Sequence, residues 1–307
     1  MAAEPAWIAV DWGTSNLRLW GLDRGGAVLF SAASDQGMGR LDRDGYPAAL
    51  AALLAGRLAP DGPAIDVVVC GMAGARQGWM EAPYLATPAD LDDLAAKAVR
   101  PDLGASRLRP RILPGLCQTD VGHEDVMRGE ETQLLGLAAL QPGFSGLVCM
   151  PGTHCKWARL DGRRVERFTS AMTGELFDVL KLHSVLRHSL NGTDDPVLRE
   201  QGLDEGLAIG LAAPERLISR LFKVRAAALL SDRPAAWCAG FLSGLLIGSE
   251  VGGQRADLGH DELPLIGGTA LSRIYARALA MVGVRSRHVD AADAVLAGLA
   301  AARQAGA

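Results

Sequence analysis

Two segments of this chain, far apart in the sequence, share one pattern of an apolar strand, a Gly-Thr turn and a second apolar strand. The first reads VDWGTSNLRLW from Val10, and the second reads CMPGTHCKWARL from Cys149. A further β-like run follows each, so each half of the chain is expected to open on a three-stranded meander. The repetition favours two related domains with a cleft between them. Because Gly-Thr turns are common, an accidental likeness remains the alternative.

The length of the chain also favours two domains. At 307 residues the chain has reached the size at which a single hydrophobic core usually divides. The breaker Gln141-Pro142-Gly143 precedes the second meander, so we expect domains at 1–140 and 141–307. Strand-like and helix-like runs occur in both halves, which predicts the α/β class.

The periodicity of apolar residues and the turn signals assign individual elements. Strands are expected at 7–10, 17–22, 27–32, 65–70, 111–113, 147–150, 156–160, 164–169, 263–266 and 287–289. Helices are expected at 47–58, 88–99, 130–140, 175–190, 204–211, 214–230, 235–251, 269–282 and from 291 onward.

Charge and composition exclude several classes of protein. Lys plus Arg is 31 and Asp plus Glu is 35, a net charge of −4, which argues against a nucleic-acid binder that must neutralise phosphates. Five scattered cysteines without a CxxC pair argue against a disulfide framework or a zinc knuckle. The first residues carry no basic leader, and the apolar run 236–249 is short for a bilayer. We therefore expect a cytoplasmic protein without a membrane anchor.

The first Gly-Thr turn, DWGTSN, carries residue types that bind phosphate. Gly13 permits a sharp turn with positive φ, and Thr14, Ser15 and Asn16 can donate hydrogen bonds to phosphate oxygens. Asp11 stands at a strand end, where its carboxylate could hold Mg²⁺ directly or through water. An ordinary hairpin capped by an aspartate is the alternative.

The second turn offers Gly152 and Thr153 for phosphate, with Lys156 nearby. Two such loops could approach one phosphate chain from opposite domains. His154 and Cys155 look like a reactive pair, but adjacent strand residues point to opposite faces, so neither a catalytic dyad nor a metal site is expected.

A third glycine turn, Gly267-Gly268-Thr269, follows the run LPLI and opens a helix. Backbone N–H groups and the helix dipole at such a turn can contact a ligand, and paired glycines let a flat ring approach the main chain. This combination is common in α/β proteins, so it gains weight only as the last of three ordered motifs.

The three motifs in this order resemble the actin-like ATPase superfamily, which includes sugar kinases. The P-loop and protein-kinase signatures are absent. Over almost the whole chain, the sequence looks like the 2-dehydro-3-deoxygalactonokinase family; Ala75-Arg76-Gln77 is a departure inside one block. The blocks are 8–20 (IAVDWGTSNLRLW), 71–79 (GMAGARQGW), 82–88 (APYLATP), 114–117 (PGLC), 126–136 (VMRGEETQLLG), 150–157 (MPGTHCKW), 172–176 (MTGEL) and 241–250 (FLSGLLIGSE).

The resemblance implies a fold and a reaction. It implies two actin-like (ribonuclease H-like) domains, each a mixed sheet flanked by helices, around an interdomain cleft that closes on its ligands. It also implies transfer of phosphate from ATP, with Mg²⁺, to the 6-hydroxyl of 2-keto-3-deoxygalactonate. The gluconate epimer, a kinase of another small sugar and a non-catalytic ATP-binding assembly protein remain alternatives. A homodimer is left open.

The resemblance also assigns roles. Asp11 would hold Mg²⁺, and Glu130 would accept the hydroxyl proton because Gly129-Glu130 occupies the place of the superfamily's catalytic Gly-Asp pair. Glu131 adjoins it, and successive helical residues point about 100° apart, so one of the two should face the cleft. An acidic first helical turn is the structural alternative. Asp120 and Asp125 are fallback candidates for the base.

The phosphate contacts implied are Gly13 to Asn16 on one side and Gly152, Thr153 and Lys156 on the other, with the third turn bordering the nucleoside. The substrate carboxylate calls for an arginine, for which Arg128 is the first choice and Arg18 the second. Four aromatic residues could wall the sugar pocket, although large aromatic residues more often belong to the core. They are Trp12, Trp79, Tyr84 and Trp157.

Overall fold

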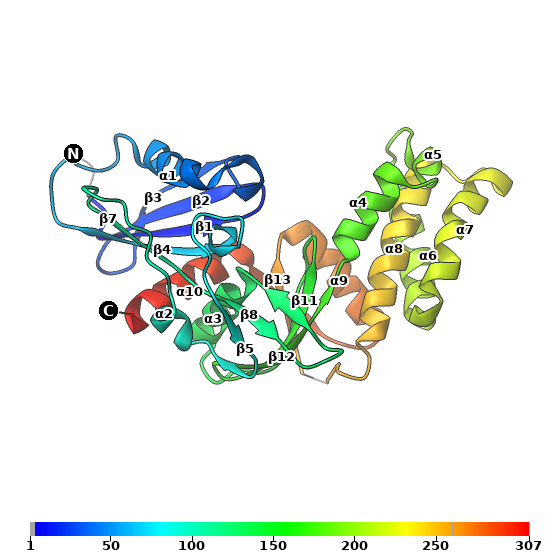
Figure 1. Cartoon of the computed structure of the whole chain (residues 1–307). Coiled ribbons are helices and arrows are strands. Elements are labelled where there is room, and N and C mark those ends of the chain that lie inside the picture. The colour runs from blue at the N-terminus through cyan, green and yellow to red at the C-terminus, as the bar shows by residue number, and fades with distance from the viewer. Residues whose placement is uncertain (1–3, 260, 307) are drawn as a thin grey trace. The chain divides into compact units, whose positions relative to one another are not determined.

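The structure is a computed structural model that describes residues 4–259 and 261–306 (Figure 1). By their internal contacts these residues form two compact units. The first comprises 1–145, 159–168 and 291–307, and the second 146–158 and 169–290. The last helix and the segment 159–168 thus group with the first unit, whereas the expected boundary at 140/141 would place both in the second domain. That boundary stays a prediction.

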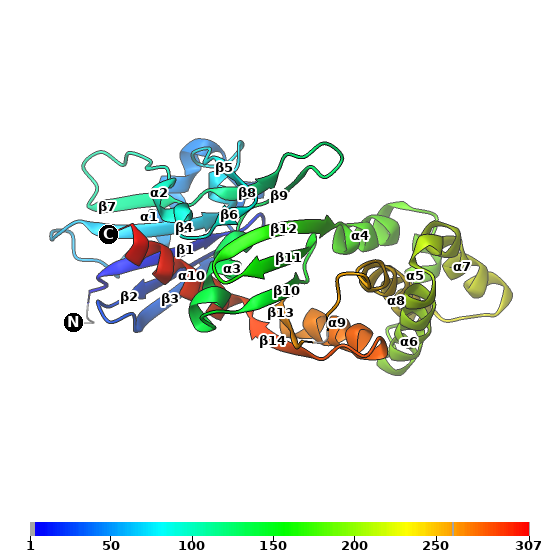
Figure 2. The ribbon, with the colours of Figure 1, turned by 90° about the horizontal axis from the view of Figure 1, so that it is seen from below.

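The first unit contains a five-stranded sheet in the order β3-β2-β1-β4-β7, whose strands lie side by side in Figure 2. β2 is antiparallel to β1 and β3, whereas β4 is parallel to β1 and β7, so the sheet is mixed. Its strands are β1 (Trp7–Trp12), β2 (Leu17–Leu22), β3 (Val28–Ser34), β4 (Ile65–Gly71) and β7 (Leu108–Ile112).

The remaining elements of this unit surround that sheet. They are α1 (Tyr46–Leu54), β5 (Tyr84–Ala86), β6 (Ala89–Asp90), α2 (Asp93–Ala96), β8 (Gly115–Gln118), β9 (Asp125–Met127), α3 (Glu130–Leu140) and α10 (Ala291–Ala305), with 3-10 turns at Met38–Arg40, Arg43–Gly45 and Met72–Gly74.

The α3 and α10 backbones touch, because a Cβ on Gly136 would stand 1.8 Å from the carbonyl oxygen of Ala294. Close packing therefore fixes α3 under the sheet.

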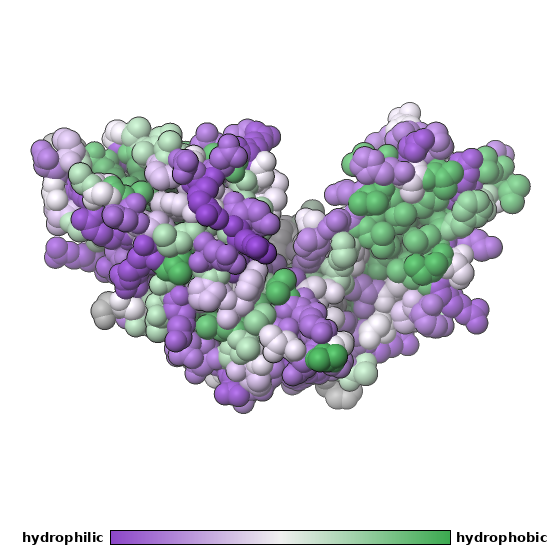
Figure 3. Space-filling model, in the orientation of Figure 1, coloured by the Kyte–Doolittle hydropathy of each residue, from purple (hydrophilic) through white to green (hydrophobic). Residues whose placement is uncertain are grey.

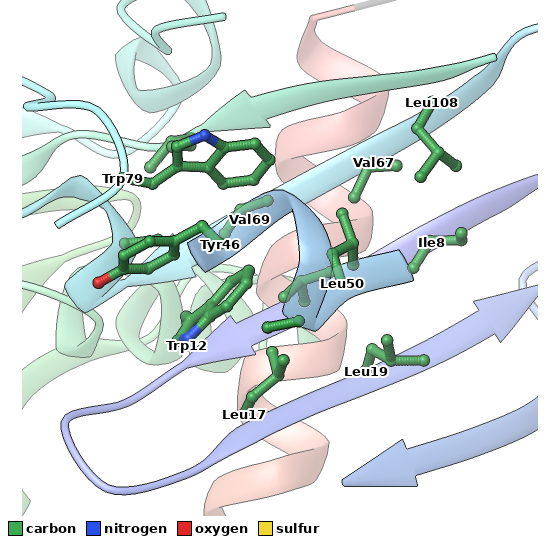
Figure 4. Close-up of a cluster of buried hydrophobic side chains, with 14 of the residues drawn as sticks. Ile8, Trp12, Leu17, Leu19, Tyr46, Leu50, Val67, Val69, Trp79 and Leu108 are labelled. Atoms are coloured by element: carbon green, nitrogen blue, oxygen red, sulfur yellow. The ribbon is translucent and has the colours of Figure 1, made fainter. Parts of the chain in front are cut away.

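The core of the first unit lies between the five-stranded sheet and α1 (Figure 4). Trp79 stacks on Tyr46 with ring centroids 6.1 Å apart and meets Trp12 edge-on at 6.0 Å. β4 is buried along nearly its whole length, as its continuous apolar run predicts. Trp12 of this cluster directly precedes the Gly-Thr turn, and its ring N–H donates to the Gln36 carbonyl at 3.0 Å.

A second sheet carries its strands in the order β12-β11-β10-β13-β14, the same arrangement of a meander followed by parallel strands. These strands are β10 (Ser145–Met150), β11 (Cys155–Asp161), β12 (Arg164–Ala171), β13 (Leu263–Gly267) and β14 (Ser286–Asp290), and the short β6 is a sixth strand, paired with β12 at its edge. β13 is parallel to both β10 and β14. The shared strand order supports the duplication inferred from the two turns, and the predicted α/β class with mixed sheets is confirmed.

Helices make up the rest of the second unit. They are α4 (Thr173–His183), α5 (Arg187–Leu190), α6 (Pro196–Ala212), α7 (Leu217–Leu230), α8 (Ala235–Gly253) and α9 (Thr269–Met281), with a 3-10 turn at Pro214–Arg216. α6 and α8 cross at backbone distance through facing glycines. A Cβ on Gly240 would lie 1.9 Å from the carbonyl oxygen of Arg199, and one on Gly206 2.4 Å from that of Phe241.

Helix α8 is longer than the apolar run suggested. By length and composition it could cross a membrane, and among the described residues it alone meets that test. Most of the helix is buried, however, packed against α6 and α7 as the central helix of this unit. Apolar side chains also reach the surface over the helices of this unit (Figure 3), including Ile218, Phe222 and Leu230 of α7.

Two expectations about secondary structure are wrong, and one small sheet was missed. Residues 88–99 do not form one helix, because Ala89 and Asp90 pair with Val165 and Arg164 of β12 and leave only the short α2. The helix expected over 175–190 is divided at Ser184, whose hydroxyl donates to the Leu180 carbonyl. The small sheet β5-β8-β9 was not foreseen at all.

Candidate functional site

The first half of the site lies where β1 and β4 end, at their carboxyl edge. Asp11 stands beside Cys70 in the parallel register of these strands, with the Cys70 thiol 3.9 Å from Asp11 Oδ1. β1 pairs on its other side with β2, which places Arg18 opposite Asp11. Arg18 donates from Nη2 and Nε to Asp11 Oδ2, at 2.5 and 3.2 Å. Arg18 therefore forms an ion pair with Asp11, and its predicted contact with the substrate stays a prediction.

The amino end of α3 meets this strand edge. Gly129 precedes the helix with φ of 110°, and a Cβ placed on it would lie 3.4 Å from the Cα of Gly71. Gly71 itself has φ of 85° and no room for a side chain, because a Cβ would stand 2.6 Å from the Trp12 carbonyl oxygen. Glu130 and Glu131 are thereby brought to the edge that holds Asp11. We call Asp11, Cys70, Glu130 and Glu131 the acidic site.

The two glutamates of the acidic site have different environments. Glu131 is completely buried, accepting from the backbone N–H of Gly129 at 2.7 Å and from the Thr132 hydroxyl at 3.0 Å. Burial, and then the charge of Glu130, raise the pKa of Glu131 to about 7. Glu130 is half-buried, with Oε2 accepting from the Arg128 N–H at 3.1 Å. Glu130 is thus the one that can meet a ligand.

The thiol of Cys70 lies close to the carboxylates of the acidic site. Its pKa lies well above the usual range, first through complete burial and then through the charges of Asp11 and Glu131. Such a thiol stays protonated and is a poor nucleophile. Cys70 therefore serves as a neutral neighbour between the carboxylates. Asp120 and Asp125 lie at the opposite end of β9 from Glu130, by the β8–β9 turn, which does not favour either as base.

The Gly-Thr turn beside Asp11 exposes its polar side chains. Thr14, Ser15 and Asn16 all reach solvent, as contacts to a phosphoryl group require. The turn itself is held by hydrogen bonds from Gly13 N–H to the Asn16 carbonyl at 2.8 Å and from Met38 N–H to the Gly13 carbonyl at 3.0 Å. The expected positive φ of Gly13 is wrong, and a Cβ there would make a tight contact, 3.3 Å from the Asn16 oxygen.

Arg128 lies one residue beyond β9. Its Nη2 donates to the Ala82 carbonyl at 2.8 Å, and its guanidinium lies over the Tyr84 ring. Its other two nitrogens, Nε and Nη1, are buried without a hydrogen-bond partner among the described residues. Since buried donors are nearly always paired, these two nitrogens are candidates for a hydrogen bond to water or to a ligand group. Trp79, by contrast, is 7% exposed within the core, the position of a packing residue rather than of a pocket wall.

The second half of the site surrounds the turn between β10 and β11. Thr153 is exposed, and its carbonyl accepts from the Glu175 N–H at 3.0 Å. Gly174, at the start of α4, approaches so closely that a Cβ would lie 2.7 Å from the Gly152 oxygen. His154 pairs with Glu175. These contacts fix the turn to the beginning of α4.

Lys156 lies at the start of β11, directly after this turn. Its side chain is buried, and its ammonium donates to Ser170 on β12. Both Cys155 and Lys156 belong to β11, so their side chains point to opposite faces of the sheet, and that of Lys156 reaches the neighbouring strand β12. A phosphate contact from Lys156 is therefore not favoured by this conformation.

The third glycine turn adjoins the second at the same sheet edge. β10 and β13 are parallel neighbours, and a Cβ on Gly267 would stand 3.2 Å from the Pro151 oxygen. Gly268 is open, with nothing within 4 Å of its Cβ position, and caps α9. Open crevices at the carboxyl ends of parallel strands are the usual ligand sites of such sheets.

A pocket of about 410 Å³ opens beside these turns in the second unit, within the size range of small-molecule sites. It is mainly apolar, and its polar lining comes from Thr153, Thr173, Asp178, Arg199, Glu200 and Ser243. The sequence-based prediction found the turn but missed the helical walls. The spacing of Ala239, Ser243 and Leu246 along α8 puts them on one face and could have revealed that wall. Leu271, Ile274 and Tyr275 of α9, Phe177 of α4 and Leu203 of α6 complete the walls.

Comparisons with known proteins agree with one another. The family model described as 2-keto-3-deoxy-galactonokinase matches residues 11–302. A Rhizobium meliloti (strain 1021) protein named "Probable 2-dehydro-3-deoxygalactonokinase DgoK1" is 45% identical, over 99% of each chain. The 2-dehydro-3-deoxygalactonokinase of Escherichia coli (strain K12) is 38% identical, over 95% of this chain and 96% of its own. A crystal structure described as a 2-dehydro-3-deoxygalactonokinase protein from Sinorhizobium meliloti has a TM-score of 0.89 at 44% identity, covering 97% and 98% of the two chains.

Proposed function

The chain belongs to the 2-keto-3-deoxy-galactonokinase family, and we propose that it phosphorylates the 6-hydroxyl of 2-dehydro-3-deoxy-D-galactonate with ATP. The products are the 6-phosphate of the sugar acid and ADP. The observation that carries this proposal is the match along residues 11–302, which contain the acidic site and all three glycine turns. The further roles below are argued from the described residues.

Glu130 is the proposed general base. Phosphoryl transfer needs a carboxylate that orients the acceptor hydroxyl and takes its proton as the new O–P bond forms. Glu130 is half-buried at the amino end of α3, with Oε2 accepting a hydrogen bond from the Arg128 N–H. Its neighbour Glu131 is fully buried and engaged by Gly129 and Thr132, so it supports the helix start instead.

Asp11 is the proposed magnesium ligand. Among the described residues no three metal-ligating side chains cluster together, but Mg²⁺ bound with a nucleotide needs only one or two carboxylates besides phosphates and water. The Asp11 carboxylate stands at the strand edge beside the exposed Gly-Thr turn, and only its Oδ2 is engaged by Arg18. The residues present therefore fit the ion. When bound, Mg²⁺ neutralises charge on the phosphates.

Arg128 is the proposed partner of the substrate carboxylate. A sugar acid needs a cationic donor that a neutral sugar does not. The orphan Nε and Nη1 of Arg128 supply such donors, and Arg128 lies two residues before Glu130, the proposed base. One arginine would thus orient the acid group while the neighbouring carboxylate orients the hydroxyl.

The second unit is proposed to bind ATP. The apolar pocket of about 410 Å³ would take the nucleoside, and the adjoining turn with Gly152 and Thr153 would contact the phosphates. Gly268 and Thr269 would add backbone donors from the start of α9. We also propose a cytoplasmic location, which the five free cysteines, four of them buried, support.

A coupled assay of ADP release tests the function. We expect the highest kcat/KM with 2-dehydro-3-deoxygalactonate, a lower value with its gluconate epimer and little turnover of neutral hexoses. Phosphorus NMR of the product should locate the phosphate on C6. Preference for a neutral hexose, or ADP release independent of any acceptor, would refute the proposal.

A further inference from the structure

Tyr84, Gly115 and Arg128 lie in one row across the small sheet β5-β8-β9. Tyr84 pairs with Gly115 in the parallel register of β5 and β8. Leu116 pairs with Met127 in the antiparallel register of β8 and β9, and one further step places Arg128 beside Gly115. Side chains in one row point to the same face of a sheet. The middle position of this row carries no side chain, so the two outer ones can meet above it.

The ring of Tyr84 occupies the space that Gly115 leaves open. A Cβ on Gly115 would stand 2.7 Å from Cε1 and 2.8 Å from Cδ1 of that ring. The guanidinium of Arg128 lies over the same ring, with Cζ 4.2 Å from the ring centroid. At this distance the cation is attracted to the π face of the ring. The backbone of Gly115, the ring and the guanidinium therefore form a stack.

Two further contacts fix the guanidinium within its plane. Nη2 donates to the Ala82 carbonyl at 2.8 Å. Nη1 lies only 2.8 Å from the position that a Cβ on residue 74 would occupy, so Gly74 makes room for it. The orientation of Arg128 is thus set by the ring, by one carbonyl and by a missing side chain. Nε and Nη1 keep their hydrogen-bonding capacity for a ligand.

We propose that Tyr84 is a positioning residue that sets the specificity of this enzyme for sugar acids over neutral sugars. It holds Arg128 in the orientation that receives the acceptor's carboxylate, and this inference rests on the proposed function. A site built around buried donors rejects an acceptor that cannot pair with them. Without the ring, Arg128 keeps its charge, but its guanidinium is no longer held in one orientation. The enzyme should therefore bind the sugar acid more weakly, with no change in its affinity for the neutral sugar.

The test compares Tyr84→Leu with Tyr84→Phe in steady-state assays of 2-dehydro-3-deoxygalactonate and ATP. Tyr84→Leu should raise the KM for the sugar acid about 3- to 30-fold, the range that a cation–π contact supports. The KM for ATP, kcat and Tm should stay near the wild-type values. Tyr84→Phe keeps the ring and should restore the wild-type KM. The ratio of kcat/KM for the acid to that for a neutral hexose should fall with Tyr84→Leu alone.

Val126→Ala is the matched control. Val126 pairs with Cys117 in the next row of the same sheet face and is 51% exposed, but it does not stack on Arg128. The KM of the Val126→Ala enzyme for the sugar acid should be unchanged. Two results for Tyr84→Leu would overturn the positioning role while leaving the kinase function standing. One is an unchanged KM for the sugar acid, and the other is an equal rise in the KM for the sugar acid and the KM for ATP with a lowered Tm. A wild-type enzyme that fails to phosphorylate the sugar acid would overturn both.

Discussion

Gly129, at the start of α3, lies directly against Gly71, at the end of β4: a Cβ on Gly129 would stand 3.4 Å from the Gly71 Cα. Both residues have positive φ, 110° and 85°. Their approach brings the helix that carries Glu130 to the strand edge that carries Asp11. The acidic site thus depends on two backbone conformations that glycine adopts readily and other residues do not.

Gly129→Ala should lower both stability and turnover. An alanine forced to positive φ is strained by about 1–3 kcal/mol, and relief of the strain would displace the adjacent Glu130. Gly122→Ala is the control, because Gly122 has φ of 84° in an exposed loop with nothing near its Cβ position. Urea denaturation should show a comparable loss of stability in both variants, with kcat reduced only in Gly129→Ala. Equal kcat in the two would argue against this role of the glycine contact.

Glu131 should make the protein less stable as pH rises. Its pKa is about 7 in the folded chain against an ordinary value of 4.5, so between these values the folded state keeps a proton that the unfolded state has released. The free energy of unfolding should therefore fall across this window, by up to about 3 kcal/mol from this group. Glu131→Gln has no such titration. Unfolding curves at pH 5 and pH 8 should show a smaller decrease for the variant, and parallel decreases would contradict the assignment.

The glycines between α6 and α8 should be sensitive to a single methyl group. Gly240→Ala would place a Cβ 1.9 Å from the Arg199 carbonyl oxygen, and forcing the helices apart should cost about 1–3 kcal/mol or more. Gly253→Ala, on the same helix, has nothing within 4 Å and should be neutral or slightly stabilising. Thermal unfolding of the two variants tests this, and equal Tm values would contradict the close crossing.

The pocket of the second unit should govern ATP affinity alone. Ser243→Phe would fill part of it, and we expect the KM for ATP to rise at least about 10-fold, or ~1.4 kcal/mol, with little change in the KM for the sugar acid. Ser219→Phe places the same ring on the exposed side of α7 and should have no effect. A Ser243→Phe enzyme with normal ATP affinity would remove the pocket from the nucleotide site.

Much of the fold follows from local sequence signals. The two meanders, the buried strand β4 and the helix Glu130–Leu140 were predicted because their apolar patterns and glycine turns are strong and short in range. Residues 88–99 were mispredicted because helix-start signals at Pro88 compete with strand pairing to β12, a partner some 75 residues away. Strands of three or four residues, such as β5 and β9, carry too few positions for a detectable period.

The site was predictable in part for the same reason. The glycine turns and the acidic helix start are continuous motifs, so the sequence located them. The ion pair of Arg18 with Asp11, the burial of Lys156 and the stack of Arg128 on Tyr84 depend on cross-strand register. Register follows from the turns and from the apolar patterns of the paired strands taken together, so it cannot be read from one strand alone.

The central claim is that Glu130 removes the acceptor proton at a site whose remaining parts only bind and orient. The most direct measurement is kcat of Glu130→Gln with saturating ATP, Mg²⁺ and 2-dehydro-3-deoxygalactonate. Loss of a general base should reduce kcat by about 10²- to 10⁴-fold while both KM values stay near those of the wild type. A Glu130→Gln enzyme that keeps near-normal kcat would contradict the account.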